Sequence, residues 1–260
     1  MKSTDLKLTM LGTGNSAMMP VYGCDCSACQ QAQNQPQFRR EKSSAYIEHN
    51  GRILLLDANA PDLMQRFPAG SIDRILLTHY HMDHVSALFD LRWGKAPTLP
   101  VISPEDEQGC DDLYKYPGML DFSQRIRPFE SFVWQQVTIT ALPLNHSRPC
   151  LGYAFEWQGG CIAYLTDTNG LPEETASWLK ERKVDWIVTD CNYPPIECEQ
   201  TRLSKNHNDI IQTKAIFEQC QPSNIGLMHV SHDVIIWANQ NPEQFTPNFQ
   251  ILSDGQEITL

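Results

Sequence analysis

Short apolar runs recur along the whole chain, either alternating with polar residues or continuous, and both patterns are typical of β-strands. They predict strands over residues 6–11, 45–48, 52–56, 73–77, 100–102, 136–142, 151–156, 161–165, 186–189 and 224–228. Turn residues join some of these strands as hairpins, at Asn50-Gly51 and at Gly159-Gly160. A further hairpin is predicted over 249–260, around Asp254 and Gly255.

Helices are predicted between the strands, over residues 61–67, 85–93, 106–114, 172–182 and 209–219. Strands that alternate with helices predict a layered α/β architecture. Because the chain shows no internal repeat, low-complexity tract or linker, one domain over residues 1–260 is expected.

No apolar run is long enough to span a membrane. The segment Met1–Asp5 is polar and precedes only a short apolar run, which is not the pattern of a signal peptide. A cytoplasmic protein with no membrane partner is therefore expected.

The charge balance bears on the substrate class. The chain has 31 acidic and 20 basic residues, a net charge of -11, and no long basic block. Binding to long nucleic acid depends on basic residues that neutralise phosphates, so such a partner is disfavoured. A small anionic substrate is compatible with this charge, because bound cations can reverse the local field.

A dense polar cluster, T-H-Y-H-M-D-H, follows the apolar residues 75–77. At the end of an extended strand, His79 and His81 point the same way, whereas Asp83 and His84 lie on the first turn of a helix and face a second position. Such a cluster cannot face a core unpaired, but divalent cations bind all of these groups. The spacing predicts two adjacent metal ions.

Three of the nine cysteines form a second cluster, Cys24-x-Cys26-x2-Cys29. An odd count without a secretion signal argues against a disulfide framework. The cluster predicts a zinc-binding loop at about residues 22–32, with a redox pair or buried thiols as alternatives. The other six cysteines are expected to be small buried side chains.

Single metal-binding residue types also follow later strands, at His146, Asp167 and His229. Alone, each is more typical of a turn or a helix cap. Together with the His79–His84 cluster, they resemble the metal-ligand series of the metallo-β-lactamase superfamily, over nearly the whole chain. Asp57 lies where that family has an Asp after an early strand, whereas Asn59 replaces a Gly found in many members.

This resemblance implies an α/β fold, an αβ/βα sandwich of two mixed β-sheets flanked by helices. It also implies the ligand sets of two divalent ions, bridged by Asp167. One ion takes His79, His81 and His146, and the other takes Asp83, His84 and His229.

Further motifs resemble those of one family within the superfamily, the phosphoribosyl cyclic phosphodiesterases of the carbon–phosphorus lyase pathway. These motifs are the cysteine motif, L-R-W-G at 91–94, D-E-Q-G-C-D-D-L at 106–113, P-L-N-H-S at 143–147 and H-V-S-H at 229–232. This resemblance implies hydrolysis of 5-phospho-α-D-ribosyl 1,2-cyclic phosphate to ribose 1,5-bisphosphate in phosphonate catabolism, by attack of a metal-bridging hydroxide on phosphorus. It also implies Mn²⁺ or Zn²⁺ as the two catalytic ions, a homodimer, and His232 as fourth ligand of one structural Zn²⁺.

The resemblance further assigns catalytic residues. His207, in K-N-H-N-D, is expected to protonate the leaving ribose 2-oxygen, although a His in a polar loop is usually only solvated. Asp83 is expected to serve catalysis as well as metal binding. Three cations near these residues in sequence are candidates for binding the 5-phosphate: Arg148, Arg202 and Lys205. His49, beside a turn, is expected to be exposed.

Other functions stay open. The chain could be another hydrolase of this fold, such as a ribonuclease of the transfer-RNA processing type, a thioesterase or a lactonase. A non-catalytic relative of the pyrroloquinoline quinone biosynthesis B protein is a further alternative, although the metal set here is complete. A last hypothesis concerns coupling: because His232 follows His229 by three residues, one segment would join the structural zinc to the catalytic site.

Overall fold

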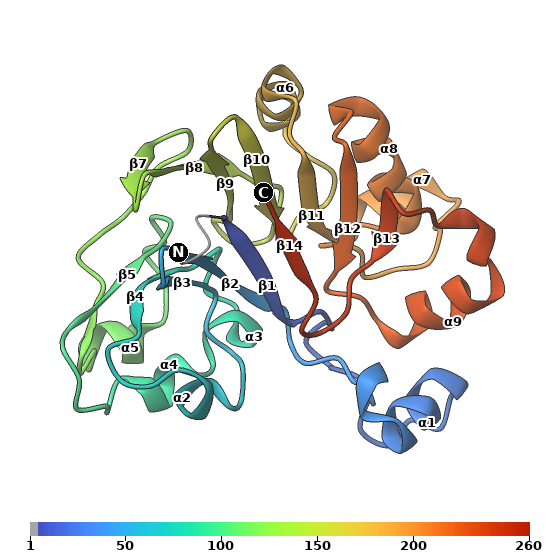
Figure 1. Ribbon diagram of the computed structural model, residues 1–260. Coiled ribbons are helices and arrows are strands. Elements are labelled where there is room, and N and C mark those ends of the chain that lie inside the picture. Colours follow the sequence, from blue (N-terminus) through green and yellow to red (C-terminus); the bar gives the residue numbers. More distant parts are fainter. Residues whose placement is uncertain (1–4) are drawn as a thin grey trace.

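Two seven-stranded β-sheets form the centre of the molecule in the computed structural model, which describes residues 5–260 (Figure 1). The first sheet has the order β14-β1-β2-β3-β4-β5-β6, and the second has the order β13-β12-β11-β10-β9-β8-β7. Both sheets are mixed. In the first, β2 and β3 are antiparallel and β3 and β4 are parallel; in the second, β8 and β9 are antiparallel and β10 and β11 are parallel. The predicted sandwich of two mixed sheets is therefore confirmed.

The strands of the first sheet are β1 Lys7–Gly12, β2 Ser44–His49, β3 Arg52–Leu56, β4 Ile72–Leu76, β5 Leu99–Ile102, β6 Leu120–Asp121 and β14 Glu257–Thr259. The strands of the second sheet are β7 Ser131–Trp134, β8 Val137–Pro143, β9 Leu151–Trp157, β10 Gly160–Leu165, β11 Trp186–Asp190, β12 Asn224–Met228 and β13 Phe249–Ile251. The α-helices are α1 Ser27–Asn34, α2 Leu63–Arg66, α3 Met82–Val85, α4 Leu88–Leu91, α5 Asp111–Lys115, α6 Glu173–Arg182, α7 Glu199–Leu203, α8 Ile210–Cys220 and α9 His232–Gln240. Two short 3₁₀ helices are η1 Pro36–Phe38 and η2 Pro242–Gln244.

The main core lies between the two sheets. Met10 and Ile47 from the first sheet pack with Tyr153, Phe155 and Tyr164 from the second, and all five are fully buried. Fully burying one such large apolar side chain contributes about 1.5–3 kcal/mol. This contact fixes the two sheets relative to each other, and with them the loops that follow their strands.

Helices cover the outer face of each sheet. Leu63 of α2, Leu88 of α4 and Leu113 of α5 pack on the first sheet. Leu179 of α6 and Ile216 of α8 belong to the core on the outer face of the second. The segment around α1 projects from the sandwich and packs against α9 (Figure 1).

The predicted C-terminal hairpin is wrong. Strand β13 pairs in parallel with β12 in the second sheet, whereas β14 pairs with β1 in the first. The turn between them is fixed to the first sheet, because the Asp254 carboxylate accepts hydrogen bonds from the backbone N–H groups of Thr13 at 2.8 Å and Glu41 at 2.7 Å. The chain therefore crosses from one sheet to the other at this turn.

Two predicted helices are shortened by hydrogen bonds from elsewhere in the chain. The helix predicted over 85–93 is divided into α3 and α4, because Ala58 donates its N–H to the carbonyl of His84 and accepts the N–H of Ala87. The helix predicted over 106–114 begins only at Asp111. The Asp106 carboxylate accepts the N–H groups of Gln108 and Gly109 and holds that segment in a turn.

The longer helices α6 and α8 are confirmed. In α8, Asp209 accepts the N–H of Gln212 while the Gln212 side chain accepts the N–H of Asp209, which satisfies two N–H groups at the helix start.

Among residues 5–260, no helix has both the length and the apolar character needed to cross a membrane. The prediction about Met1–Asp5 concerns residues that, apart from Asp5, lie outside the described part of the chain.

Two predictions about single side chains are wrong. His49 is buried, not exposed, and its ring packs edge-on against Trp157. Cys198 is exposed and not buried. Of the other five scattered cysteines, Cys110 is half-buried, and the remaining four are buried: Cys150, Cys161, Cys191 and Cys220.

Candidate metal centres

Loops that follow strands of both sheets bring seven predicted ligands together. They follow β4, β8, β10 and β12, or lie in α3. We call these residues the histidine cluster: His79, His81, Asp83, His84, His146, Asp167 and His229. Within it, the ligand atoms form overlapping groups in which they lie within 4.8 Å of one another. The structure thus places every residue of the predicted set in one location.

The first group contains three imidazoles. His81 Nδ1 lies 2.9 Å from His79 Nε2 and 3.0 Å from His146 Nε2. Nitrogen ligands at about 2.1 Å from a metal ion and at right angles to each other lie about 3 Å apart. The spacing of these nitrogens therefore fits one bound ion.

The second group contains Asp83, His84 and His229, and Asp167 lies between the two groups. The Asp167 carboxylate oxygen Oδ2 is 3.2 Å from His84 Nε2, 3.5 Å from His229 Nε2 and 3.8 Å from His79 Nε2. His84 Nε2 and both His229 nitrogens are buried without a hydrogen-bond partner among the described residues. Such atoms are costly to bury, and a bound cation would satisfy them. The residues present thus fit divalent cations, and Asp167 lies between the two groups.

The charge states suit metal binding. Burial lowers the pKa of His146 to about 4 and that of His79 well below its ordinary value, so both imidazoles are neutral at pH 7 and offer a lone pair. Burial opposes ionisation of Asp83, but the imidazoles of His229 and His84 outweigh burial and lower its pKa to about 2. His79 and His146 therefore offer neutral nitrogens and Asp83 offers an ionised carboxylate, whereas at His84 the carboxylates of Asp167 and Asp57 outweigh burial and raise the pKa well above its ordinary value.

Asp57 orients two of the histidines. Its carboxylate accepts the Nδ1–H of His84 at 2.8 Å and the hydroxyl of Thr78 at 3.0 Å, and that hydroxyl lies 3.0 Å from His79 Nδ1. The Nε2 atoms of both rings are thereby directed into the cluster. His146 is oriented in the same way, because its Nδ1 lies 3.1 Å from the carbonyl oxygen of Asn206.

Asn59 fixes the backbone at Asp83. Its side-chain amide donates to the carbonyl of Ser43 at 2.7 Å and to the carbonyl of Asp83. A Gly at this position would lack both contacts. Asn59, which departs from the family pattern, therefore stabilises the local backbone through these two hydrogen bonds.

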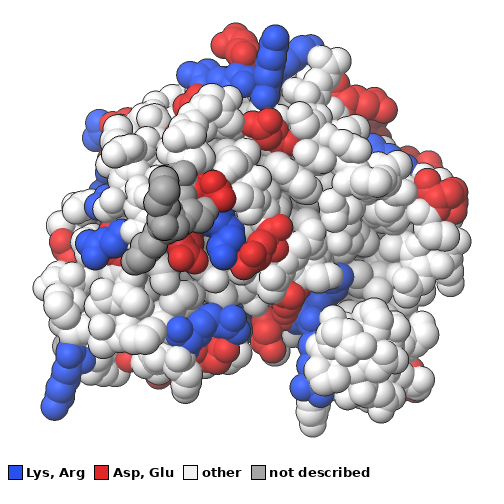
Figure 2. All heavy atoms as spheres, in the orientation of Figure 1, with Lys and Arg blue, Asp and Glu red and all other residues white. Residues whose placement is uncertain are grey.

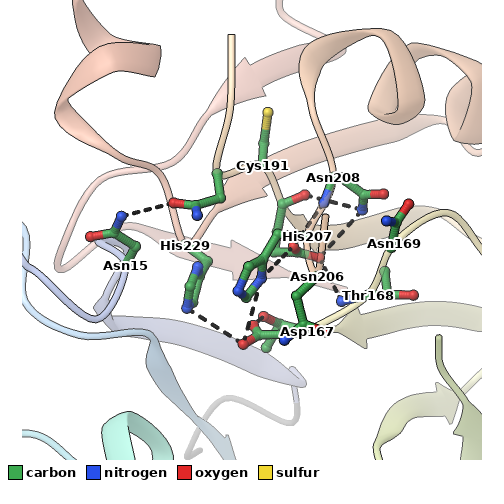
Figure 3. Close-up of polar contacts among 12 residues, drawn as sticks. Asn15, Asp167, Thr168, Asn169, Cys191, Asn206, His207, Asn208 and His229 are labelled. Carbon is green, nitrogen blue, oxygen red and sulfur yellow. Dashed lines mark hydrogen bonds and ion pairs between the residues drawn. The ribbon is translucent and has the colours of Figure 1, made fainter. Parts of the chain in front are cut away.

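His207 lies beside the histidine cluster, where its ring stacks on His229 with centroids 4.6 Å apart (Figure 3). Its Nδ1 lies 3.2 Å from the Asp190 carboxylate and 3.8 Å from that of Asp167. Burial acts to lower the pKa of His207, but the hydrogen bond with Asp190 and the charge of Asp167 outweigh it and raise this pKa. With His146 and Asp167, His207 also forms a group that could hold an ion.

Asp190 also belongs to the site, although the sequence pattern did not predict it. The Asp190 carboxylate accepts the N–H groups of Thr168 at 3.0 Å and Asn208 at 3.2 Å, which fixes it beside His207. The sequence did contain a hint of this role, because Asp190 ends a strand in the same way that Asp57 and Asp167 follow strands.

The cysteine cluster is a separate site, formed by Cys24, Cys26, Cys29 and His232. The three sulfur atoms lie 3.4, 3.4 and 3.5 Å from His232 Nδ1. A tetrahedral zinc ion with Zn–S of about 2.3 Å and Zn–N of about 2.05 Å puts sulfur and nitrogen about 3.6 Å apart. This set of four ligands fits one zinc ion and leaves no position for water.

One short segment joins the two clusters. His232 begins α9, and Ser231 caps that helix by accepting the N–H of Val234. Ser231 also donates its hydroxyl to the carbonyl of Asn192, near the end of β11. The coupling hypothesis is compatible with this geometry.

Comparison with known proteins places the chain in a family. Residues 52–230 match the family model of the beta-lactamase superfamily domain. The chain belongs to the beta-lactamase superfamily. Solved structures of the metallo-β-lactamase fold within this superfamily resemble the whole chain, although at low sequence identity.

One such structure is a diphosphatase from the PhnP family, with a TM-score of 0.81 and 24% identity over 98% of this chain and 97% of that one. Another is Zn²⁺-bound PqqB from Methylobacterium extorquens, with a TM-score of 0.77 and 17% identity over 98% and 100% of the two chains. At these identities the similarity shows the fold alone.

Curated relatives carry several different names. An octanoyltransferase of Porphyromonas gingivalis is 30% identical over 98% of this chain and 52% of its own length. A ribonuclease Z of Clostridioides difficile is 25% identical over 59% of this chain and 50% of its own length. This chain thus spans only about half of each relative.

Proposed function

We propose that the chain is a metal-dependent phosphodiesterase that hydrolyses 5-phospho-α-D-ribosyl 1,2-cyclic phosphate to ribose 1,5-bisphosphate in phosphonate catabolism. The observation that carries this proposal is His207, held by Asp190 at 3.2 Å next to the histidine cluster. Opening a cyclic sugar phosphate releases an alkoxide, which is a poor leaving group. A positioned acid beside a metal site supplies the proton that this step needs.

The proposed roles of the residues follow from their positions. His79, His81 and His146 would hold one divalent ion, Mn²⁺ or Zn²⁺, and Asp83, His84 and His229 would hold the second, with Asp167 shared. Two such ions, when bound, supply an acidified water and positive charge at the phosphoryl oxygens. Asp57 keeps the ligand nitrogens aimed into the cluster, and the cysteine cluster would hold one structural Zn²⁺.

His207 would act on the leaving oxygen. Because its Nδ1 faces Asp190, its Nε2 is available to donate a proton to the ribose 2-oxygen as the bond to phosphorus breaks. Asp190 holds the ring in this orientation and stabilises its protonated form. Asp167 and Asp190 are both buried, so bulk water does not screen their charges from His207.

The comparisons support this proposal at different strengths. The PhnP-family neighbour covers nearly the whole chain and acts on diphosphates, so a phosphoric anhydride is the second candidate substrate class. A ribonuclease Z activity has relatives in its favour but needs a basic surface for RNA. On the face seen in Figure 2, Lys and Arg are interspersed with Asp and Glu and form no continuous basic surface.

The other functions that the sequence left open, a thioesterase, a lactonase or a PqqB-like protein, can each be tested. Thioesterase and lactonase activities need only the same metal site, and the octanoyltransferase similarity makes an octanoyl thioester a useful assay substrate. A PqqB-like role would not require His207.

We also propose one domain over residues 1–260, a homodimer and a cytoplasmic location, with a small phosphorylated sugar as the partner.

The test is a substrate panel with protein loaded with Mn²⁺ or Zn²⁺. The panel contains the phosphoribosyl cyclic phosphate, 2',3'-cyclic nucleotides, a nucleoside diphosphate sugar, bis(p-nitrophenyl) phosphate, precursor tRNA, a lactone and octanoyl thioester. We expect the highest kcat/KM with the phosphoribosyl cyclic phosphate. A higher value for the diphosphate, RNA, lactone or thioester would contradict the proposal.

A further inference from the structure

The proposed substrate carries a second phosphate on its sugar, and the structure narrows down which cation binds it. A protein with a net charge of -11 must supply local positive charge for such a group. Three cations lie near His146 and His207 in the sequence: Arg148, Arg202 at the end of α7, and Lys205. Their contacts differ, and this difference decides between them.

Arg148 is fully engaged within the protein. Its Nε and Nη2 lie 3.0 and 2.9 Å from one Asp106 carboxylate oxygen. Its other N–H groups donate to the carbonyls of Tyr80 at 3.2 Å and Gly109 at 3.1 Å. A substrate phosphate would have to break this ion pair, so Arg148 serves the fold.

Arg202 is engaged in a similar way. Its guanidinium donates to the carbonyl of Ile196 at 2.6 Å and lies 3.2 Å from the buried carboxylate of Asp209. Asp209 in turn accepts the N–H of Ile196 at 2.7 Å. These contacts engage Nε and Nη2 of Arg202 and link the segment before α7 to the start of α8, so Arg202 holds this part of the chain in place.

Lys205 differs from both arginines. Within residues 5–260 it makes no ion pair, and its Nζ lies over the ring of Tyr193, 5.3 Å from the centroid. Its backbone is nevertheless fixed. Its N–H donates to the carbonyl of Arg202 at 3.1 Å, and its carbonyl accepts the side-chain amide of Asn169.

The pair of Lys205 and Tyr193 lies next to the catalytic residues. Lys205 precedes His207 by two residues, and Tyr193 follows Asp190 by three. The N–H of Tyr193 lies 3.3 Å from the carbonyl of Asn208, which joins the two segments. Asn169, Asn206 and Asn208 surround His207 in this loop region (Figure 3).

We infer that Lys205 is a specificity-determining residue that binds the phosphomonoester on the sugar of the substrate, with the ring of Tyr193 beside it. An ammonium group offers three donors to phosphate oxygens. Because Lys205 lies two residues before His207, one loop would carry both the phosphate ligand and the proposed acid. This inference rests on the proposed function and names the group that the substrate must carry.

The experiment compares two substrates on the metal-loaded protein: 5-phosphoribosyl 1,2-cyclic phosphate and the same cyclic phosphate without the 5-phosphate. For Lys205→Ala we expect the ratio of the two kcat/KM values to fall about tenfold, since a hydrogen bond to a charged group is lost. The fall should arise from a higher KM for the phosphorylated substrate, with kcat retained. Lys205→Arg should restore part of the ratio.

Lys42→Ala is the matched control. Lys42 forms an isolated β-bridge with Gly14 and lines a cavity of about 260 Å³ together with Glu41 and Asp90. Glu41 and Asp90 bring negative charge to this cavity, which does not suit a phosphate, so replacement of Lys42 should keep the ratio. An unchanged ratio in Lys205→Ala, or an equal fall in Lys42→Ala, would overturn the inference.

A binding measurement separates this inference from the proposed function. Calorimetric titration with ribose 5-phosphate needs no turnover, and we expect about tenfold weaker binding to Lys205→Ala than to the unsubstituted protein. If neither cyclic phosphate is hydrolysed, the proposed function fails while this titration still decides the role of Lys205. Equal binding of ribose 5-phosphate to both proteins would overturn that role.

Discussion

The histidine cluster and the cysteine cluster differ in how the chain assembles them. The cysteine cluster takes three of its four ligands from residues 24–29, a short segment that runs into α1 and packs on α9. The histidine cluster takes its ligands from segments between residues 79 and 229, on both sheets. Burial does not separate the two clusters, because Cys29 is buried like His79, His84 and Asp167, and His81, Asp83 and His146 are partly exposed like Cys24, Cys26 and His232.

The surroundings of the two clusters differ as well. In the histidine cluster, Asp57, Thr78 and the Asn206 carbonyl hold the outward nitrogens of three ligands, and His207 lies next to the ligand set. The cysteine cluster has a closed set of four ligands. We infer from this difference that one site serves chemistry and the other serves folding.

The largest expected effect comes from His207. If His207 is the acid and not a ligand, His207→Ala should lower kcat about 10²- to 10⁴-fold. Steady-state kinetics and metal analysis on the same sample check this, with the metal content unchanged. Lys180→Ala, on an exposed position of α6, is the control. Unchanged turnover would remove His207 from the mechanism, and loss of an ion would make it a ligand.

Asp57 tests the support of the histidine cluster. Asp57→Asn removes the charged acceptor of His84 Nδ1 and should weaken metal binding about 10- to 100-fold. Competition with a chelator of known affinity measures this. Asp62→Asn, in an exposed ion pair with Arg66, is the matched control and should bind metal normally. Equal affinities in the two variants would show that orientation of His84 is unimportant.

The ligands of the histidine cluster could be predicted from the sequence, whereas Asp190 could not. The ligands of the histidine cluster follow strands with a clear apolar pattern, directly or, for Asp83 and His84, in the short helix after β4, so the sequence could predict both the strands and the ligands. Asp190 follows the same rule, but a lone Asp after a strand is usually a turn residue. Its role depends on His207, which reaches it from 17 residues away in the chain.

The errors in the fold have a shared physical cause. The turn at Asp254 belongs to a crossing between sheets because Thr13 and Glu41 bind its carboxylate. The break between α3 and α4 is made by Ala58. His49 is buried because Trp157 of the other sheet packs on it. In each case a distant segment decides the structure, and local patterns contain no information about it.

A smaller effect is expected at the cysteine cluster. Cys26→Ser should remove the zinc ion and lower Tm by about 4–8 °C, corresponding to about 2 kcal/mol for a chain of this size. Metal analysis and thermal unfolding measure the two quantities. The exposed Cys198→Ser serves as control and should leave both unchanged. The coupling between clusters would be refuted if Cys26→Ser kept both its zinc and its Tm.

The smallest expected effect is at Asn59, which touches the backbone of one ligand only. Asn59→Gly loses the hydrogen bonds to the carbonyls of Ser43 and Asp83 and should reduce the free energy of unfolding by about 1–2 kcal/mol. Urea unfolding measures this. A more stable variant would mean that the Asn is not what holds Asp83 in place.

The most direct test of the account is the number of metal ions in protein that is active on the phosphoribosyl cyclic phosphate. Quantitative elemental analysis per chain should give three ions, two in the histidine cluster and one zinc in the cysteine cluster. Active protein with no ion, or with a single ion, in the histidine cluster would contradict the account.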